Sequence, residues 1–148
     1  MSAEENKASV RRMAEEVFNK GSMSIVPELI THDYVYNSPF GEFKGPLGFM
    51  LFTAMMRNAF PDIHMAIDDM IGEGNKVAVR LSWRGTFTGK FGDIEPTGKS
   101  INMSTAYFYR YKNGKGVEAT HYTDMLTFYQ QLGIPIPNQK HFNWDQAF

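Results

Sequence analysis

Cysteine is absent from the 148 residues of this sequence. Its absence excludes disulfide bonds, thiolate catalysis and cysteine-ligated zinc sites together. Clusters of basic residues are also missing, because no run of Lys and Arg exceeds two residues and the formal net charge is −1. Proteins that bind nucleic acid carry a strongly basic surface, so no nucleic-acid partner is expected.

Long hydrophobic stretches are missing as well. The longest, near residues 49–56, is too short and too interrupted to span a bilayer, so no membrane partner is expected. The N-terminus is polar and acidic, and it lacks the basic and then apolar layout of a signal peptide. These features predict a cytoplasmic protein.

Several catalytic and cofactor motifs are absent. Gly98-Lys99-Ser100 does not complete a phosphate-binding loop, because Asp93 stands where the first glycine is required. No Gly-x-Ser-x-Gly motif occurs, which argues against a serine hydrolase. No short metal-ligand spacing joins the four histidines, which are His32, His64, His121 and His141. We therefore expect no metal and no cofactor.

Helical signals come early in the chain. Ser2 and Glu5 form a capping box ahead of an amphipathic helix that ends at Gly21, and its apolar face consists of Val10, Met13, Ala14, Val17 and Phe18. A short second helix is expected after Ser24, with Pro27 in its first turn and its end near Ile30. A third begins at Gly45-Pro46 and ends at Pro61.

Strand signals dominate the rest. A short strand at 33–37 precedes a turn at 38–41, and alternating segments follow near 63–68, 77–87, 101–111 and 117–123. Asn113-Gly114 indicates a two-residue hairpin turn, and a last helix ends at Gly133. This order predicts one α+β domain over 1–148, in which helices cover one face of a strongly curved antiparallel sheet that encloses an apolar pocket for a small organic molecule.

The strand at 101–111 carries bulky side chains on both faces, with Tyr107 and Tyr109 on one and Phe108 on the other. Helices cover only one face, so we expect a homodimer formed through the outer face. The tail at 138–148 contains Phe142, Trp144 and Phe148, which need a surface on which to bury. Alternatively, this tail folds over the pocket mouth or is disordered.

Asp124 is the candidate catalytic residue. It ends the last strand with the same parity as Thr120 and Tyr122. At the apolar mouth of a curved sheet, desolvation would raise the pKa of this carboxyl, as a general base near neutral pH requires. The alternative is that Asp124 only caps the helix that follows it.

The ordered strings Ala59-Phe-Pro-Asp62, Pro96-Thr-Gly-Lys99 and Gln131-Leu-Gly133 support a family resemblance. The chain resembles the SnoaL-like polyketide cyclases, also called ester cyclases, of the nuclear-transport-factor-2-like superfamily, from the first helix to Pro137. This resemblance implies a cone-shaped α+β fold and metal-free chemistry. In that chemistry an acidic residue on the last strand removes a proton next to a carbonyl, and the enolate closes a ring by an intramolecular aldol reaction. Asp124 occupies the position of that residue.

Two positions depart from the family pattern. Thr120 stands where the family has Trp, and Asn37 where it has His; an asparagine can donate a hydrogen bond to an enolate but cannot shuttle a proton. Asn37 and Tyr122 are candidate polar partners of the substrate, and Trp83 and Thr120 candidate pocket wall. Trp83 and Tyr122 can equally be core or dimer contacts.

We therefore expect a cyclase acting on a small carbonyl-containing molecule. Two alternatives stay open, because fold alone does not choose a function. One is a non-catalytic small-molecule-binding or dimerisation module, and the other is an isomerase or hydrolase on the same scaffold.

Overall fold

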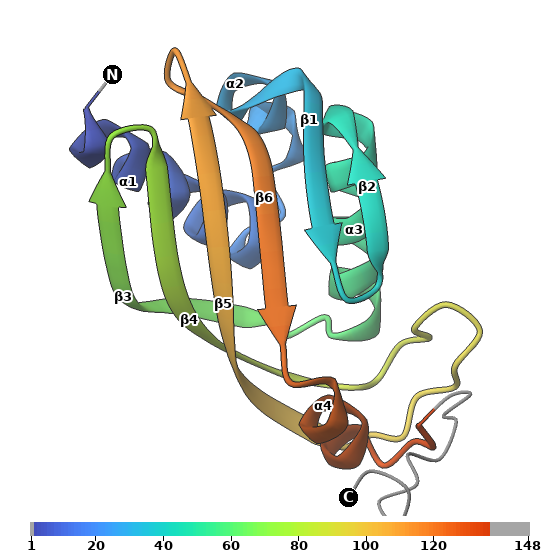
Figure 1. Cartoon of the computed structure of the whole chain (residues 1–148). Coiled ribbons are helices and arrows are strands. Elements are labelled where there is room, and N and C mark those ends of the chain that lie inside the picture. The colour runs from blue at the N-terminus through green and yellow to red at the C-terminus, as the bar shows by residue number, and fades with distance from the viewer. Residues whose placement is uncertain (1, 137–148) are drawn as a thin grey trace, which may run out of the picture.

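A six-stranded sheet organises the computed structural model, which describes residues 2–136 (Figure 1). Its strands are β1 (Ile30–Ser38), β2 (Gly41–Lys44), β3 (His64–Glu73), β4 (Lys76–Thr86), β5 (Ser100–Lys112) and β6 (Lys115–Thr123). Across the sheet the order is β2-β1-β6-β5-β4-β3. The pairing of β1 with β6 is parallel and the other pairings are antiparallel. The curved α+β fold is confirmed, with this parallel pair as a correction.

Helices cover one face of the sheet. They are α1 (Ala3–Arg12), which continues as the π-helical segment η1 (Met13–Asn19), the 3-10 turn η2 (Met23–Ile25), α2 (Val26–Leu29), α3 (Gly45–Ala59) and α4 (Met125–Leu132). The first three α-helices lie on the same side of the sheet, whereas α4 lies at the end where β6 finishes (Figure 1). The helices predicted from the sequence are therefore confirmed.

The predicted helix ends have clear physical causes. The Ser2 hydroxyl accepts a hydrogen bond from the Glu5 N–H at 3.2 Å, as the capping box requires. Gly21 ends the first helical segment with a φ of +73°, a conformation that glycine adopts without strain. In the last turn before that end, the carbonyls of Phe18 and Asn19 accept hydrogen bonds from the Arg57 guanidinium at 2.5 and 3.1 Å, which ties the segment to α3.

The strand β2 was not predicted. Its four residues pair with the second half of β1 across the turn at Pro39-Phe40, so β1 is also longer than expected. β2 has no alternating apolar pattern, because Phe43 is its only large apolar side chain. The Phe43 ring lies 5.3 Å from that of Phe52 in α3, so tertiary packing stabilises a strand that local sequence does not indicate.

The two faces of the sheet differ sharply in burial. Alternate residues of β4, namely Val77, Val79, Leu81 and Trp83, are buried against the helices. On β5, Tyr107 and Tyr109 are buried on this inner face, whereas Phe108 is 53% exposed on the outer one. The prediction of a strand that is bulky on both faces is confirmed.

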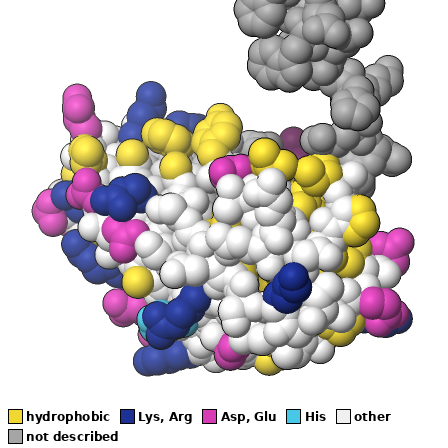
Figure 2. Space-filling model, turned by 90° about the horizontal axis from the view of Figure 1, so that it is seen from below, with side chains coloured by type: hydrophobic (Ala, Val, Ile, Leu, Met, Phe, Trp, Pro, Cys, Tyr) yellow, Lys and Arg dark blue, Asp and Glu magenta, His cyan; other side chains and the backbone are white. Residues whose placement is uncertain are grey.

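The end of the molecule at α4 mixes side-chain types. Seen from below, hydrophobic side chains form small groups among charged side chains of both signs, with no extended area of one charge (Figure 2). Within residues 2–136, no helix is both long and apolar enough to cross a membrane. The tail at 138–148, whose aromatic residues were predicted to need a surface on which to bury, lies outside the described residues.

Candidate active site

A buried histidine lies on the inner face of the sheet, near the C-terminal end of β6. The alternation of β6 turns Ala119 and His121 inward, and His121 is 6% exposed. Because β6 lies between β1 and β5, the neighbours of His121 on this face come from both strands. Tyr36 of β1 pairs with Ala119, and Tyr107 of β5 pairs directly with His121. Strand pairing therefore gathers three polar aromatic side chains that are distant in sequence.

Hydrogen bonds join these side chains into one network. The Nδ1 atom of His121 lies 2.9 Å from the Tyr36 hydroxyl, which donates to the Tyr107 hydroxyl at 3.2 Å. On the other side, Nε2 lies 2.5 Å from Thr123 Oγ1, which is 3.2 Å from Thr105 Oγ1. Both imidazole nitrogens thus have partners, as a buried histidine requires.

Aromatic rings hold the imidazole in place. The Tyr107 ring stacks on it with the centroids 4.5 Å apart and the planes at 12°. Tyr36 and Phe52 close the other sides, with centroids at 6.1 and 6.3 Å. These contacts exclude water around the ring, and a low-dielectric environment disfavours charge on it.

Burial fixes the protonation states of the network. It lowers the pKa of His121 to about 4 and raises the pKa of Tyr107 to about 12. Burial also raises the pKa of Tyr36 well above its ordinary value. At neutral pH the imidazole is therefore uncharged and both phenols keep their protons. A neutral imidazole has one nitrogen lone pair free to accept a proton, which is the requirement for a general base.

Trp83 lies on the inner face, as a pocket-wall residue must. Its ring packs between Phe60 of α3's end, at 5.3 Å, and Phe128 of α4, at 6.4 Å. Phe128 also contacts Phe40, at 5.5 Å, and these rings form an apolar surround at the α4 end of the sheet. The contacts satisfy the core-packing interpretation, while binding of a substrate by Trp83 stays a prediction.

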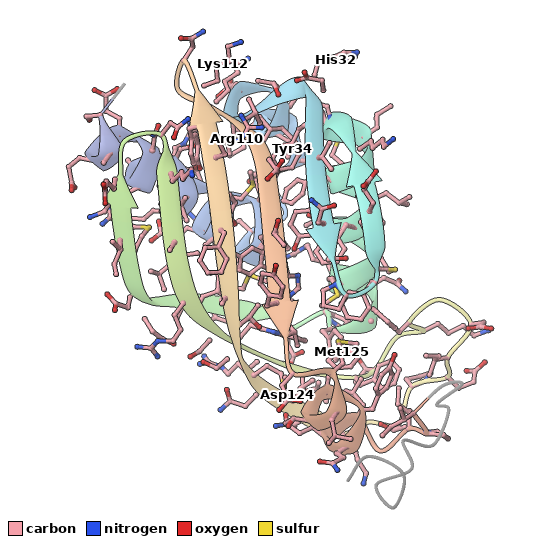
Figure 3. All side chains as sticks on the ribbon, viewed as in Figure 1. His32, Tyr34, Arg110, Lys112, Asp124 and Met125 are labelled. Carbon is pink, nitrogen blue, oxygen red and sulfur yellow. The ribbon has the colours of Figure 1, made fainter. Side chains whose placement is uncertain are left out.

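Asp124 caps α4 (Figure 3). Its carboxylate accepts hydrogen bonds from the Thr127 N–H at 3.1 Å and the Thr127 hydroxyl at 2.6 Å. The hydroxyl bond and then the backbone bond lower the pKa of this exposed carboxyl. The expectation of a raised pKa is wrong, because the carboxylate is hydrogen-bonded in water instead of desolvated. A catalytic role for Asp124 stays a prediction.

Asn37, Thr120 and Tyr122 lie together, but on the outer face. Asn37 pairs with Thr120, and both alternate with the buried residues of their strands. Tyr122 is 61% exposed and its ring lies 6.1 Å from that of Phe108. The expectation that these three side chains face the interior is corrected. Thr120 and Tyr122 were placed on the pocket side because they have the same parity as Asp124. That inference fails because Asp124 lies beyond the last residue of β6.

Sequence reasoning missed the His121 network. Tyr107 was assigned to one face of a strand that has bulky side chains on both faces, but His121 was considered only as a metal ligand. Within residues 2–136, no three or more His, Asp or Glu side chains cluster so as to hold a metal ion. A usable signal was the alternation itself, because Ala119 and His121 share a face that is opposite to Thr120 and Tyr122.

Comparisons with known proteins agree with this fold. A family model described as SnoaL-like polyketide cyclase matches residues 8–132. The chain has no match among curated protein sequences. A solved structure from Jannaschia sp. CCS1, a proposed SnoaL-like polyketide cyclase, is 20% identical with a TM-score of 0.83, covering 90% of this chain and 95% of that one. At that identity it supports the fold alone.

Two solved structures are more similar in sequence. IdmH, a proposed polyketide cyclase from Streptomyces antibioticus, is 26% identical with a TM-score of 0.75, covering 87% of this chain and 99% of its own. A proposed polyketide cyclase from Bacillus cereus ATCC 10987 is 28% identical with a TM-score of 0.72, covering 89% of this chain and 83% of its own.

Proposed function

This chain belongs to the SnoaL-like polyketide cyclase family, and on that basis we propose that it closes a ring in a small carbonyl compound with His121 as the general base. One observation carries the proposal. His121 is a buried imidazole, uncharged at neutral pH, with hydrogen bonds at both nitrogens on the inner face of the sheet. His121 lies on the last strand, β6, three residues before Asp124, the position to which the family resemblance assigns the base.

The chemistry needs only proton transfer and one new carbon–carbon bond. The Nε2 lone pair of His121 takes a proton from a carbon beside a carbonyl; the C–H bond breaks, and its electron pair moves to the carbonyl oxygen as an enolate. The enolate carbon then attacks a second carbonyl of the same molecule, whose oxygen becomes an alkoxide. The imidazolium returns its proton to that alkoxide. No oxidant or reductant is consumed, and the product is an isomer of the substrate.

The strength of this base limits the substrate class. A histidine with a pKa of about 4 accepts protons weakly, and proton transfer is efficient only when the pKa values of donor and acceptor are not far apart. The proposed substrate therefore carries its acidic hydrogen on a carbon between two carbonyls, as linear polyketides do. The aromatic side chains of Phe52, Trp83 and Phe128 favour a largely apolar molecule.

A carboxylate base at Asp124 is the second candidate, which the family resemblance favours. Two conservative variants separate the candidates. His121→Gln removes the base and keeps a polar side chain, so ring closure should fall at least about 100-fold. Asp124→Asn should keep nearly full activity, because asparagine caps helices as well as aspartate does.

The assay follows ring closure of linear tri- and tetraketide esters by chromatography and NMR. Loss of activity in Asp124→Asn with retention in His121→Gln would overturn the assignment of His121. Tight binding of these esters by the wild type without any conversion would instead indicate a non-catalytic binder. Return of the proton to a different carbon, without ring closure, would indicate an isomerase.

A further inference from the structure

We propose that Tyr36 and Tyr107 are positioning residues, which hold His121 with its proton on Nδ1 and leave the Nε2 lone pair for reaction. The catalytic consequence rests on the proposed function, whereas the tautomer itself is a property of the free protein. Nothing in the chemistry of the family's acidic base calls for this tyrosine pair.

The direction of the hydrogen bonds carries the argument. A phenol has a single proton to donate, and the Tyr36 hydroxyl donates it to Tyr107 at 3.2 Å. Toward His121, 2.9 Å away, the Tyr36 oxygen can then only accept. Nδ1 must therefore carry the hydrogen, and a neutral imidazole has no second hydrogen for Nε2.

The other end of the network is consistent with this tautomer. A bare Nε2 accepts a hydrogen bond, and the Thr123 hydroxyl at 2.5 Å can donate one. The Thr123 oxygen can in turn accept from the Thr105 hydroxyl at 3.2 Å. Thr123 is only partly buried, whereas Tyr36 and Tyr107 are 0% and 2% exposed. Nε2 therefore faces the less buried end of the network, and the proposed reaction requires the substrate to approach from this end and displace the threonine hydroxyl.

Packing prevents the imidazole from rotating out of this orientation. A half-turn of the ring about the Cβ–Cγ bond would put carbon atoms where Nδ1 and Nε2 now lie. Both hydrogen bonds of the imidazole would then be broken. The Tyr107 ring stacked at 4.5 Å opposes such a rotation. Water cannot replace the lost partners at this burial without new space, so the cost would be the full desolvation of both nitrogens.

The chain supplies a matched control in Tyr34. It lies on the same strand and the same face as Tyr36 and is 1% exposed. Within the described residues, its hydroxyl has no hydrogen-bond partner. Tyr34→Phe thus removes the same atom from the same environment without touching the network.

The test is an NMR measurement of the tautomer at pH 7. Full-length protein labelled with 15N in histidine gives long-range 1H–15N correlations, which distinguish the protonated from the bare ring nitrogen. The His121→Gln spectrum assigns the signal. We expect the Nδ1–H tautomer in the wild type and in Tyr34→Phe. In Tyr36→Phe the acceptor is lost, so the ratio of Nδ1–H to Nε2–H should fall about tenfold.

Tyr107→Phe provides a second and more specific expectation. Without its acceptor, the Tyr36 hydroxyl turns to donate to Nδ1, which moves the imidazole proton to Nε2. An Nε2–H tautomer in the wild type, or an unchanged ratio in both phenylalanine variants, would overturn the proposal. A purely structural role would lower stability and leave the ratio unchanged. If Tyr36→Phe does not fold, the wild-type spectrum still decides.

No substrate enters this measurement, so its failure is distinguishable from failure of the proposed function. Loss of ring closure in His121→Gln together with an Nε2–H wild type would leave His121 as the base and reject the positioning role. The Nδ1–H tautomer in the wild type, together with undiminished ring closure in His121→Gln, would support the positioning role and reject His121 as the base.

Discussion

Burial decides the chemistry of individual residues in this protein. His121 and Asp124 lie three positions apart, yet the first is enclosed by aromatic rings and the second is exposed at a helix end. Enclosure lowers the pKa of the imidazole because the charged form is poorly solvated, whereas hydrogen bonds from Thr127 lower the pKa of the carboxyl because they stabilise its charge. The result is an uncharged, buried imidazole and an exposed carboxylate that caps a helix.

The buried histidine should make stability depend on pH. Its pKa is about 4 in the folded protein, against 6.5 for an unperturbed histidine. The unfolded chain therefore binds the proton more readily than the folded protein does. The contribution of the uncharged His121 to the free energy of unfolding is complete above pH 6.5 and is lost as the pH falls through 4. At 1.36 kcal/mol per pH unit the loss amounts to about 3 kcal/mol. The measurement is the free energy of unfolding in urea at several pH values.

Carboxylates also contribute to acid unfolding, so the informative quantity is the difference between wild type and His121→Gln. That difference should shrink by about 3 kcal/mol between pH 7 and pH 4. His32→Gln, at an exposed position, is the matched control and should follow the wild type. A wild-type curve parallel to that of His121→Gln would contradict a buried neutral imidazole.

At the scale of elements, the hairpin of β5 and β6 explains why the site was not found from the sequence. The turn at Asn113-Gly114 was predicted, and it pairs Lys112 with Lys115. Continued without interruption, that register would set Tyr107 opposite Thr120. A bulge between Arg110 and Tyr111 shifts the pairing by one residue, so that Tyr107 meets His121. Because a one-residue shift exchanges the faces of a strand, the inward residues of β6 could not be deduced from the turn.

Other elements were predictable to the extent that their signals are local. Caps, glycine stops and apolar periodicity located the helices, since each acts within a few residues. The strand β2 and the parallel pairing of β6 with β1 depend on contacts between distant segments. Contacts of that kind produce no periodic pattern of residues in the sequence. The hydrogen bond between Tyr36 and His121 was missed for the same reason.

The cap of α4 is testable as an element. Asp124→Ala removes both hydrogen bonds to Thr127 and should lower the free energy of unfolding by about 1 kcal/mol. Asp124→Asn is the matched control and should change it by only a few tenths, because the amide oxygen still accepts from the backbone. Thermal and urea unfolding measure both. Equal losses in the two variants would show that the charge, not the cap, is what matters.

Among residues 2–136, helices cover one face of the sheet and leave the other uncovered. Helices bury the inner face, while the outer face exposes the large apolar side chains of Ile71, Phe108 and Tyr122 at 66%, 53% and 61%. Monomeric proteins seldom leave such groups together in water. We propose that a second copy covers this face, because twofold dimers are the commonest closed assemblies of identical chains.

Sedimentation velocity at micromolar concentration tests the dimer. The expected species has about twice the chain mass of 16.9 kDa. Phe108→Glu combined with Tyr122→Glu places charges on the outer face and should yield the monomer. Leu47→Glu, at a position of α3 that is 81% exposed, is the control and should stay dimeric. A wild-type species of 16.9 kDa would rule the dimer out.

Deuterium exchange measures the proposed proton abstraction by His121 without requiring ring closure. A linear triketide ester is incubated with the protein in deuterated buffer, and exchange at the carbon between two carbonyls is followed by NMR against a buffer blank. We expect exchange above the blank for wild type and for Asp124→Asn, and none above the blank for His121→Gln. Exchange that persists in His121→Gln and disappears in Asp124→Asn would contradict this expectation.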